Sequence, residues 1–139
     1  MEHRKINKSD DNLPAGKFLK TRINSFGFAI NGIFLLFRTE IHARIHLLAT
    51  IFVIILGFFL KISGTDWCII ALTCSAVISA EAFNTAIEAM VNLISPDIHP
   101  LAGRAKDIAA GAVLIMSIGA LIVGIIIFVP YFFLYFKHH

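Results

Sequence analysis

The sequence predicts an all-α membrane protein with one amphipathic surface helix and three transmembrane helices. Hydrophobic residues make up 58% of the chain, and only 15% of its residues are charged. An ordinary soluble domain carries about 25% charged residues. Three long apolar runs are separated by short polar segments. The length of 139 residues allows one domain, so residues 17–139 are expected to form a single integral-membrane domain.

The N-terminal part predicts a tail followed by the surface helix. Residues 1–16 are polar and lack periodicity, and we expect a disordered cytoplasmic tail there. Residues 17–38 carry apolar side chains at helical spacing, with basic residues at both ends. This combination is typical of a helix that lies in the membrane interface. The alternative is a core helix of a soluble domain, for which the remaining sequence leaves little room.

The three apolar runs are each long enough to cross a bilayer, which takes about 20 residues. They predict spans at residues 41–62, 67–95 and 108–129. Trp67 opens the second span as an interfacial aromatic residue. Pro130 is expected to end the helix of the third span, because proline disrupts a helix interior.

The positions of lysine and arginine predict the orientation. Most of them precede the first span or lie in the polar loop of residues 96–107, whereas Lys61 and Lys137 are the basic residues on the other side. Basic residues favour the cytoplasmic side of a membrane. The N-terminus and the loop of residues 96–107 are therefore expected on the cytoplasmic side of the membrane.

The stretch SAEAFNTAIEAM places polar side chains inside the second span. Around a helix, Glu88 lies about 20° and Asn84 about 60° from Glu81, so the three share one face. A carboxylate in hydrocarbon costs at least a few kcal/mol, which means that this face must meet protein or a wet cavity. At about 1.5 Å per residue, Glu88 reaches the cytoplasmic interface and Glu81 lies about 10 Å deeper.

Further charged residues are expected at the same membrane level. Glu40 precedes the first span, and Lys106 and Asp107 precede the third. Carboxylates that converge need a cation, and oxygen ligands completed by substrate phosphates suit magnesium. Lys106 can hold a phosphate as a point charge. The pattern predicts phosphoryl transfer from ATP to a membrane lipid alcohol, with the deeper Glu81 as general base.

Two other functions remain open from these residues alone. A small oligomeric transporter could use Glu81 as a proton relay, but it would not need Glu88 and the Lys106–Asp107 pair at the same level. A structural membrane subunit would need these residues only for assembly. No P-loop or dinucleotide-binding motif is present, and no nucleic-acid motif appears. Cys68 and Cys74 are expected to be reduced, buried, small apolar residues on different helix faces.

The stretch EAFNTAIEAMVNLISPDIHPLAGRAKDIAAGAVL resembles the signature of the prokaryotic diacylglycerol kinases, a family that includes undecaprenol kinases. The core of the resemblance is E-x-x-N-[TS]-A-I-E followed by H-x-L-[AS]-x-x-A-K-D, and it extends over residues 17–129. The resemblance implies a small kinase of the bacterial cytoplasmic (inner) membrane that uses ATP and magnesium. It also implies a homotrimer with active sites between subunits.

The resemblance also implies roles for particular residues. The family's metal carboxylates match Glu40 and Glu88. Its general base matches Glu81, and the amide partner of that base matches Asn84. Its phosphate-contacting pair matches Lys106 and Asp107, and its nucleotide contacts match His99, Gly103 and Phe28. Two positions depart from the family pattern. Asn92 replaces an acidic residue, which puts an adenine contact in doubt, and Phe28 lacks a hydroxyl group. The segment HPLAGRAKDIAAGAVL is more similar to the undecaprenol kinases. Undecaprenol is therefore favoured over diacylglycerol as the substrate.

Overall fold

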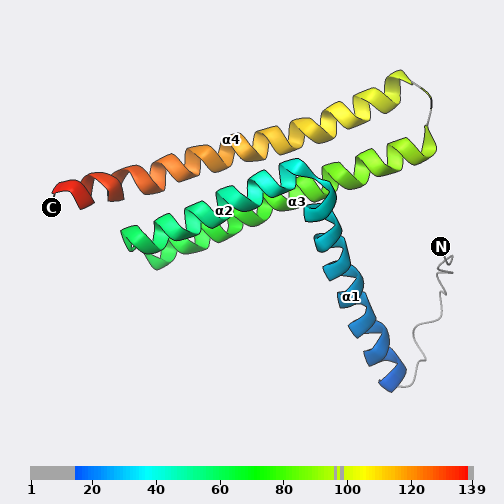
Figure 1. Cartoon of the computed structure of the whole chain (residues 1–139), viewed down its shortest axis with the longest axis horizontal. Coiled ribbons are helices and arrows are strands. Elements are labelled where there is room, and N and C mark those ends of the chain that lie inside the picture. The colour runs from blue at the N-terminus through cyan, green and yellow to red at the C-terminus, as the bar shows by residue number, and fades with distance from the viewer. Residues whose placement is uncertain (1–14, 96, 98, 138–139) are drawn as a thin grey trace. The chain divides into compact units, whose positions relative to one another are not determined.

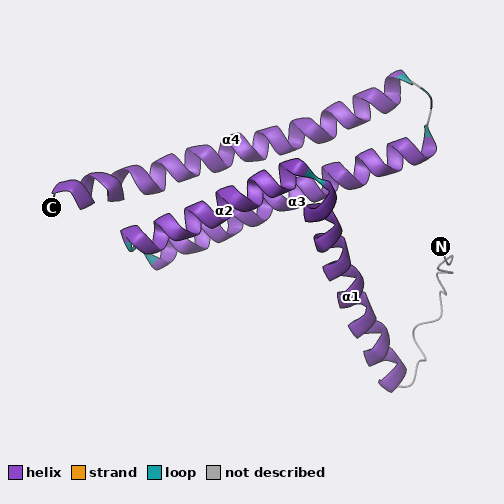
Figure 2. Cartoon of the chain, in the orientation of Figure 1, coloured by secondary structure: helices purple, strands orange, loops and turns teal. Residues whose placement is uncertain are grey.

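Four helices form the described part of the chain, and no strand occurs there (Figure 2). The computed structural model describes residues 15–95, 97 and 99–137. The helices are α1 (Ala15–Thr39), α2 (Ile41–Leu60), α3 (Gly64–Ile94) and α4 (Pro100–Lys137). Residues 1–14 of the predicted tail lie outside the described residues, and α1 begins at Ala15. The all-α prediction is confirmed.

The chain divides into two units, Met1–Leu35 and Leu36–His139. The first unit contains most of α1, and large apolar side chains between Ile23 and Leu35 are exposed, among them Phe26, Ile30 and Phe34. A helix with this many exposed apolar side chains is suited to a lipid interface. The helix expected at residues 17–38 is therefore present.

In the second unit, α2, α3 and α4 run side by side (Figure 1). The longest contact is between α3 and α4, and α2 packs against the first part of α3. All three helices are long and apolar enough to cross a membrane. Most of their large apolar side chains are exposed in the single chain, which suits contact with lipid. The prediction of three transmembrane helices is confirmed.

A tight turn joins α2 to α3. Lys61 adopts a left-handed conformation (φ 55°), and the N–H of Ile62 donates to the carbonyl of Gly57 at 3.2 Å. This arrangement satisfies carbonyl groups that the end of α2 leaves unpaired. The side chain of Ser63 caps α3 by accepting from the N–H of Asp66 at 3.2 Å. The turn therefore fixes α2 and α3 as antiparallel neighbours.

Helix α4 is longer than expected at both ends. It begins at Pro100, so Gly103, Lys106 and Asp107 lie in its first turns and not in a loop. Proline is tolerated there because its missing N–H would have no helical partner. Pro130 lies inside α4, so the expectation that it ends the helix is wrong.

Contacts beyond Pro130 explain why α4 continues. The Tyr131 hydroxyl donates to Asp66 Oδ2 at 2.8 Å and accepts from the N–H of Ser63 at 3.0 Å. Tyr135 packs against the small core around Leu60, Ile62, Ile70 and Ile127. These contacts tie the end of α4 to the α2–α3 turn. They offset the hydrogen bond that proline removes.

Candidate active site

Glu81 on α3 is the only buried charged side chain among the described residues, with 3% of its surface exposed. No hydrogen bond or ion pair to its carboxylate is found within that part of the chain. An unpaired buried carboxylate is costly unless another group compensates for it. Glu81 is therefore the first candidate for contact with a ligand.

One turn along α3, Asn84 and Glu88 are joined. Asn84 Nδ2 donates to Glu88 Oε1 at 3.1 Å. This bond orients the Glu88 carboxylate and turns the amide oxygen of Asn84 away from it. That oxygen, Asn84 Oδ1, is buried and has no hydrogen-bond partner. The structure thus confirms that Asn84 and Glu88 share a face, and it leaves a buried acceptor beside them.

Thr85 is a polar residue of this cluster that the sequence analysis did not identify. Its hydroxyl is buried and has no partner. By contrast, the hydroxyl groups of Thr50, Thr73 and Ser117 each donate to the carbonyl four residues earlier, at 2.8, 2.7 and 2.9 Å. The sequence could have predicted this residue, because Thr85 follows Glu81 by four residues and therefore shares its helix face.

Lys106 brings the start of α4 to the end of α3. Lys106 Nζ donates to Asn92 Oδ1 at 2.6 Å. Lys106 is six residues after Pro100 and Glu88 is six residues before Ile94, so the two lie at the same level of antiparallel helices. Asn92 was expected only as a departure from the family pattern, and the structure gives it a role as the partner of Lys106.

Glu40 lies between α1 and α2 and is half-buried. It occupies the N-cap position of α2, but its side chain makes no capping hydrogen bond. Glu40 is 20 residues before Leu60 and Asn84 is 20 residues after Gly64, so Glu40 and Asn84 lie at one level along α2 and α3.

The predicted metal ligands are the carboxylates of Glu40 and Glu88. Among the described residues, no three acidic, histidine or cysteine side chains lie close enough together to hold a metal ion. Magnesium usually takes only one or two carboxylates from the protein, and water and substrate phosphates complete its shell. Glu40 and Glu88 fit that donor set. Their pairing at one ion stays a prediction.

The expected nucleotide contacts lie at the start of α4 and on α1. His99 Nδ1 accepts from the N–H of Leu101 at 3.2 Å, and the N–H of Gly103 donates to the carbonyl of His99 at 3.1 Å. His99 therefore caps α4. A Cβ on Gly103 would meet nothing within 4 Å, so its surface is open. Phe28 is exposed and belongs to the N-terminal unit. Contact of these residues and of Asp107 with a nucleotide stays a prediction.

Comparison with known proteins identifies the family of the chain. The family model of prokaryotic diacylglycerol kinase matches residues 27–128, a range that includes every candidate residue above. The undecaprenol kinase of Bacillus subtilis is 43% identical over 106 residues, which cover 76% of this chain and 86% of that protein. The diacylglycerol kinase of Synechocystis is 38% identical over 107 residues, covering 76% of this chain and 61% of that protein.

A third relative, the diacylglycerol kinase of Pseudomonas aeruginosa, is 32% identical over 94 residues, covering 68% of this chain and 76% of that protein. The family model matches all of α2 and α3, including the buried Glu81, and α4 as far as Phe128. The chain belongs to the prokaryotic diacylglycerol kinase family and is a membrane lipid kinase.

Proposed function

We propose that the protein transfers the γ-phosphoryl group of ATP to the hydroxyl group of a membrane lipid alcohol, with undecaprenol favoured over diacylglycerol. The observation that carries this proposal is the buried, unpartnered Glu81 in a membrane-spanning helix. The similarity to an undecaprenol kinase, at 43% identity, supports undecaprenol over the diacylglycerol kinases at 38% and 32%.

In this reaction Glu81 acts as the general base. The lipid hydroxyl gives its proton to the Glu81 carboxylate while its oxygen forms a bond to the γ-phosphorus. The bond between that phosphorus and the bridging oxygen breaks, and ADP leaves with the electron pair. The buried acceptor Asn84 Oδ1 and the Thr85 hydroxyl lie within one turn of Glu81, where they can orient the lipid hydroxyl.

The nucleotide side of the site lies at the interfacial ends of α3 and α4. Glu40 and Glu88 are the residues that would hold magnesium, which neutralises phosphate charge when bound. Asn84 keeps the Glu88 carboxylate in place. Lys106 contributes positive charge toward the phosphates, Asp107 lies beside it, and the start of α4 offers backbone N–H groups that suit an anion.

The assembly and orientation are part of the same proposal. We expect a homotrimer in the bacterial inner membrane, with the N-terminus and the α3–α4 connection on the cytoplasmic side. The large apolar surface that a single chain exposes supports an assembly in which subunits pack against each other.

The test measures ADP release by the purified protein when a lipid alcohol is added in the presence of magnesium. The Glu81→Gln variant should lose turnover while it keeps its oligomeric state and its affinity for ATP. Unchanged turnover in this variant would remove Glu81 from the role of base. Comparing kcat/KM for undecaprenol and diacylglycerol decides between the two acceptors. The transporter alternative predicts no ADP release with either lipid.

A further inference from the structure

Two asparagine side chains on α3 hold the charged groups that the proposed function assigns to the nucleotide. Asn84 Nδ2 donates to Glu88 Oε1 at 3.1 Å, and Asn92 Oδ1 accepts from Lys106 Nζ at 2.6 Å. Asn84, Glu88 and Asn92 follow one another at intervals of four residues, so they share one face of the helix. Glu88 therefore lies between the two amides.

Glu88 and Lys106 carry opposite charges at the same level of antiparallel helices, yet they do not form an ion pair. Among the residues that the structure describes, no carboxylate lies within ion-pair distance of Lys106 Nζ. Its hydrogen-bond partner is the side-chain amide of Asn92, which is neutral. This contact therefore fixes the direction of the ammonium group without cancelling its charge.

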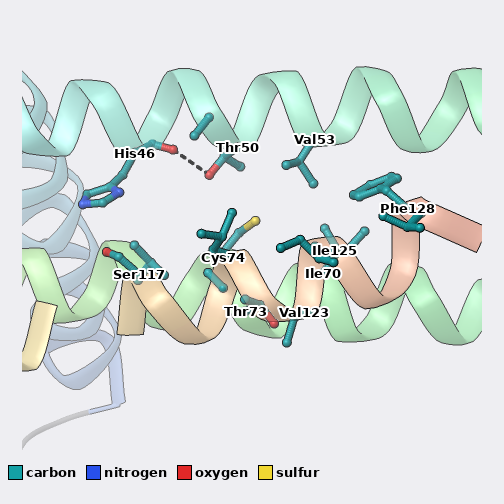
Figure 3. A pocket seen from close by; sticks show the side chains of 16 residues that line it. His46, Thr50, Val53, Ile70, Thr73, Cys74, Ser117, Val123, Ile125 and Phe128 are labelled. Atoms are coloured by element: carbon teal, nitrogen blue, oxygen red, sulfur yellow. Dashed lines mark hydrogen bonds between the residues drawn. The ribbon is translucent and has the colours of Figure 1, made fainter. Parts of the chain in front are cut away.

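The space between the three apolar helices offers no place for the phosphates of a nucleotide. A cavity of about 460 Å³ between α2, α3 and α4 is lined mainly by apolar side chains (Figure 3). No carboxylate, lysine or arginine of the described chain takes part in the lining, and the hydroxyl groups of Thr50, Thr73 and Ser117 donate to carbonyls of their own helices. Burying phosphate charge without partners is unfavourable. The phosphates therefore belong at the end of the helices where Lys106 lies.

The neutral partner matters because lysine is a flexible side chain. A long side chain loses rotamer freedom when it binds a ligand, which weakens binding unless the side chain is already ordered. The bond to Asn92 orders Lys106 within the described chain, before a nucleotide binds. An aspartate at position 92 could also order Lys106, but its negative charge would oppose the attraction between the ammonium group and the phosphates.

From these observations we infer that Asn92 is a positioning residue for ATP, and that it acts through Lys106. It holds the ammonium group at the level of Glu88 and leaves the full positive charge available to the phosphates. This inference rests on the proposed function, in which Lys106 contacts the phosphates. A direct contact of Asn92 with the adenine base is the alternative, and the experiments below distinguish the two.

The first experiment measures nucleotide affinity without turnover. The dissociation constant of a non-hydrolysable ATP analogue with magnesium is measured by equilibrium dialysis of the full-length protein in detergent. Asn92→Ala should raise it about three- to tenfold, because Lys106 must then be ordered during binding. Asn92→Asp should raise it at least about tenfold, since the carboxylate also offsets the charge of Lys106. Asn92→Gln keeps a neutral acceptor and should retain most of the affinity. Equal dissociation constants for the wild type and Asn92→Ala would overturn the inference.

The second experiment asks whether Asn92 acts through Lys106. Lys106→Met removes the ammonium group and itself weakens binding. Adding Asn92→Ala to Lys106→Met should change the dissociation constant by less than about twofold, because two substitutions that remove one shared interaction are not additive. A direct contact with adenine predicts the same loss in both backgrounds, together with a changed preference between ATP and GTP. That result would replace the inference with the alternative.

Tyr131→Phe is the matched control for a contact that only holds the helices together. It removes a hydrogen bond between α4 and α3 at the opposite end of the helices, where the Tyr131 hydroxyl donates to Asp66. The dissociation constant should stay unchanged in this variant even if the midpoint of thermal unfolding falls. If Tyr131→Phe weakens binding as much as Asn92→Ala does, Asn92 contributes only to stability and the inference fails.

Kinetics distinguish this inference from the proposed function. Asn92→Ala should raise the KM for ATP with little change in kcat, and a loss of kcat at an unchanged KM would contradict the inference. If no lipid alcohol causes ADP release while the dissociation constants follow the expected pattern, the kinase proposal fails and Asn92 still positions Lys106. If alcohols are phosphorylated and Asn92→Ala binds the nucleotide like the wild type, the kinase proposal stands and this inference fails.

Discussion

At the residue scale, the chain combines an uncompensated carboxylate with two unsatisfied polar atoms inside one turn of α3. Glu81 is a buried residue, and Asn84 Oδ1 and Thr85 Oγ1 are buried atoms without hydrogen-bond partners in the described chain. Each such atom lowers stability, since a buried polar group without a hydrogen bond costs about 1–3 kcal/mol. The combination is therefore explained better by a ligand that hydrogen-bonds there than by the folding of the helix itself.

Thr85 gives a prediction that separates function from stability. In Thr85→Val the methyl group replaces a buried hydroxyl that has no partner, so the midpoint of thermal unfolding should not fall. Turnover should fall about three- to tenfold if the hydroxyl bonds the lipid, because a neutral hydrogen bond contributes about 0.5–1.5 kcal/mol. Thr85→Ser should restore most of the turnover. Thr65→Val, at the exposed start of α3, is the control.

Lys106 gives a prediction about the nucleotide. Lys106→Gln removes the positive charge but keeps a side chain that can reach Asn92. The KM for ATP should rise about 10- to 100-fold, because a hydrogen bond to a charged group contributes about 1.5–3 kcal/mol. The KM for the lipid should change little. Lys61→Gln, at the other end of the helices, serves as the control, and an unchanged KM for ATP would exclude Lys106 from phosphate binding.

At the element scale, the close approach of α2 and α3 depends on Gly57. A Cβ atom there would lie 2.8 Å from a ring atom of Trp67, which is too close for a real contact. Trp67 in turn packs against Phe58, with ring centroids 4.8 Å apart. A Cβ atom at position 57 would therefore force the ring to shift.

This contact predicts a large difference between two glycine substitutions. Gly57→Ala should lower the free energy of unfolding by about 1–3 kcal/mol through overpacking. Gly119→Ala should be neutral or stabilising, because a Cβ there meets nothing within 4 Å and alanine favours a helix. Thermal unfolding in detergent measures both. If Gly57→Ala and Gly119→Ala had the same midpoint of thermal unfolding, the close contact of α2 and α3 at Gly57 would not contribute to stability.

The elements also show what a sequence can predict and what it cannot. The apolar runs were long enough to predict all three transmembrane helices, and helical geometry placed Glu81, Asn84 and Glu88 on one face. The ends of α4 were not predictable from local rules. Pro130 stays helical because Tyr131 makes a hydrogen bond to the distant Asp66. A contact between two helices cannot be predicted from the local sequence pattern. The pairing of Lys106 with Asn92 was not predicted for the same reason.

At the scale of the whole molecule, most of the apolar surface of the helices is uncovered. In the most apolar 18-residue stretch of α4, only 6% is buried within the chain. Lipid covers part of such a surface in a membrane, and partner subunits cover part of it in an oligomer. This uncovered surface favours an assembly of several subunits, and in the proposed homotrimer the active site would be shared between them.

A shared active site predicts that two inactive variants can complement each other. Glu81→Gln and Glu40→Gln should each be inactive as homogeneous proteins. If Glu81 and Glu40 of one site come from different subunits, mixed oligomers will contain some sites with both carboxylates intact. Random 1:1 mixing of subunits in a closed ring should restore up to about a quarter of the wild-type turnover.

The measurement is ADP release from co-expressed, co-purified variants, compared with the two variants purified separately and mixed afterwards. Activity should appear in the co-expressed sample, and in the mixed sample only as fast as subunits exchange. A third sample, Glu81→Gln co-expressed with Glu81→Gln,Glu40→Gln, is the control and should stay inactive because no Glu81 is present. If the first sample is equally inactive, Glu40 and Glu81 act within one subunit, and the apolar surface of α4 then serves contact with lipid and not the assembly of the site.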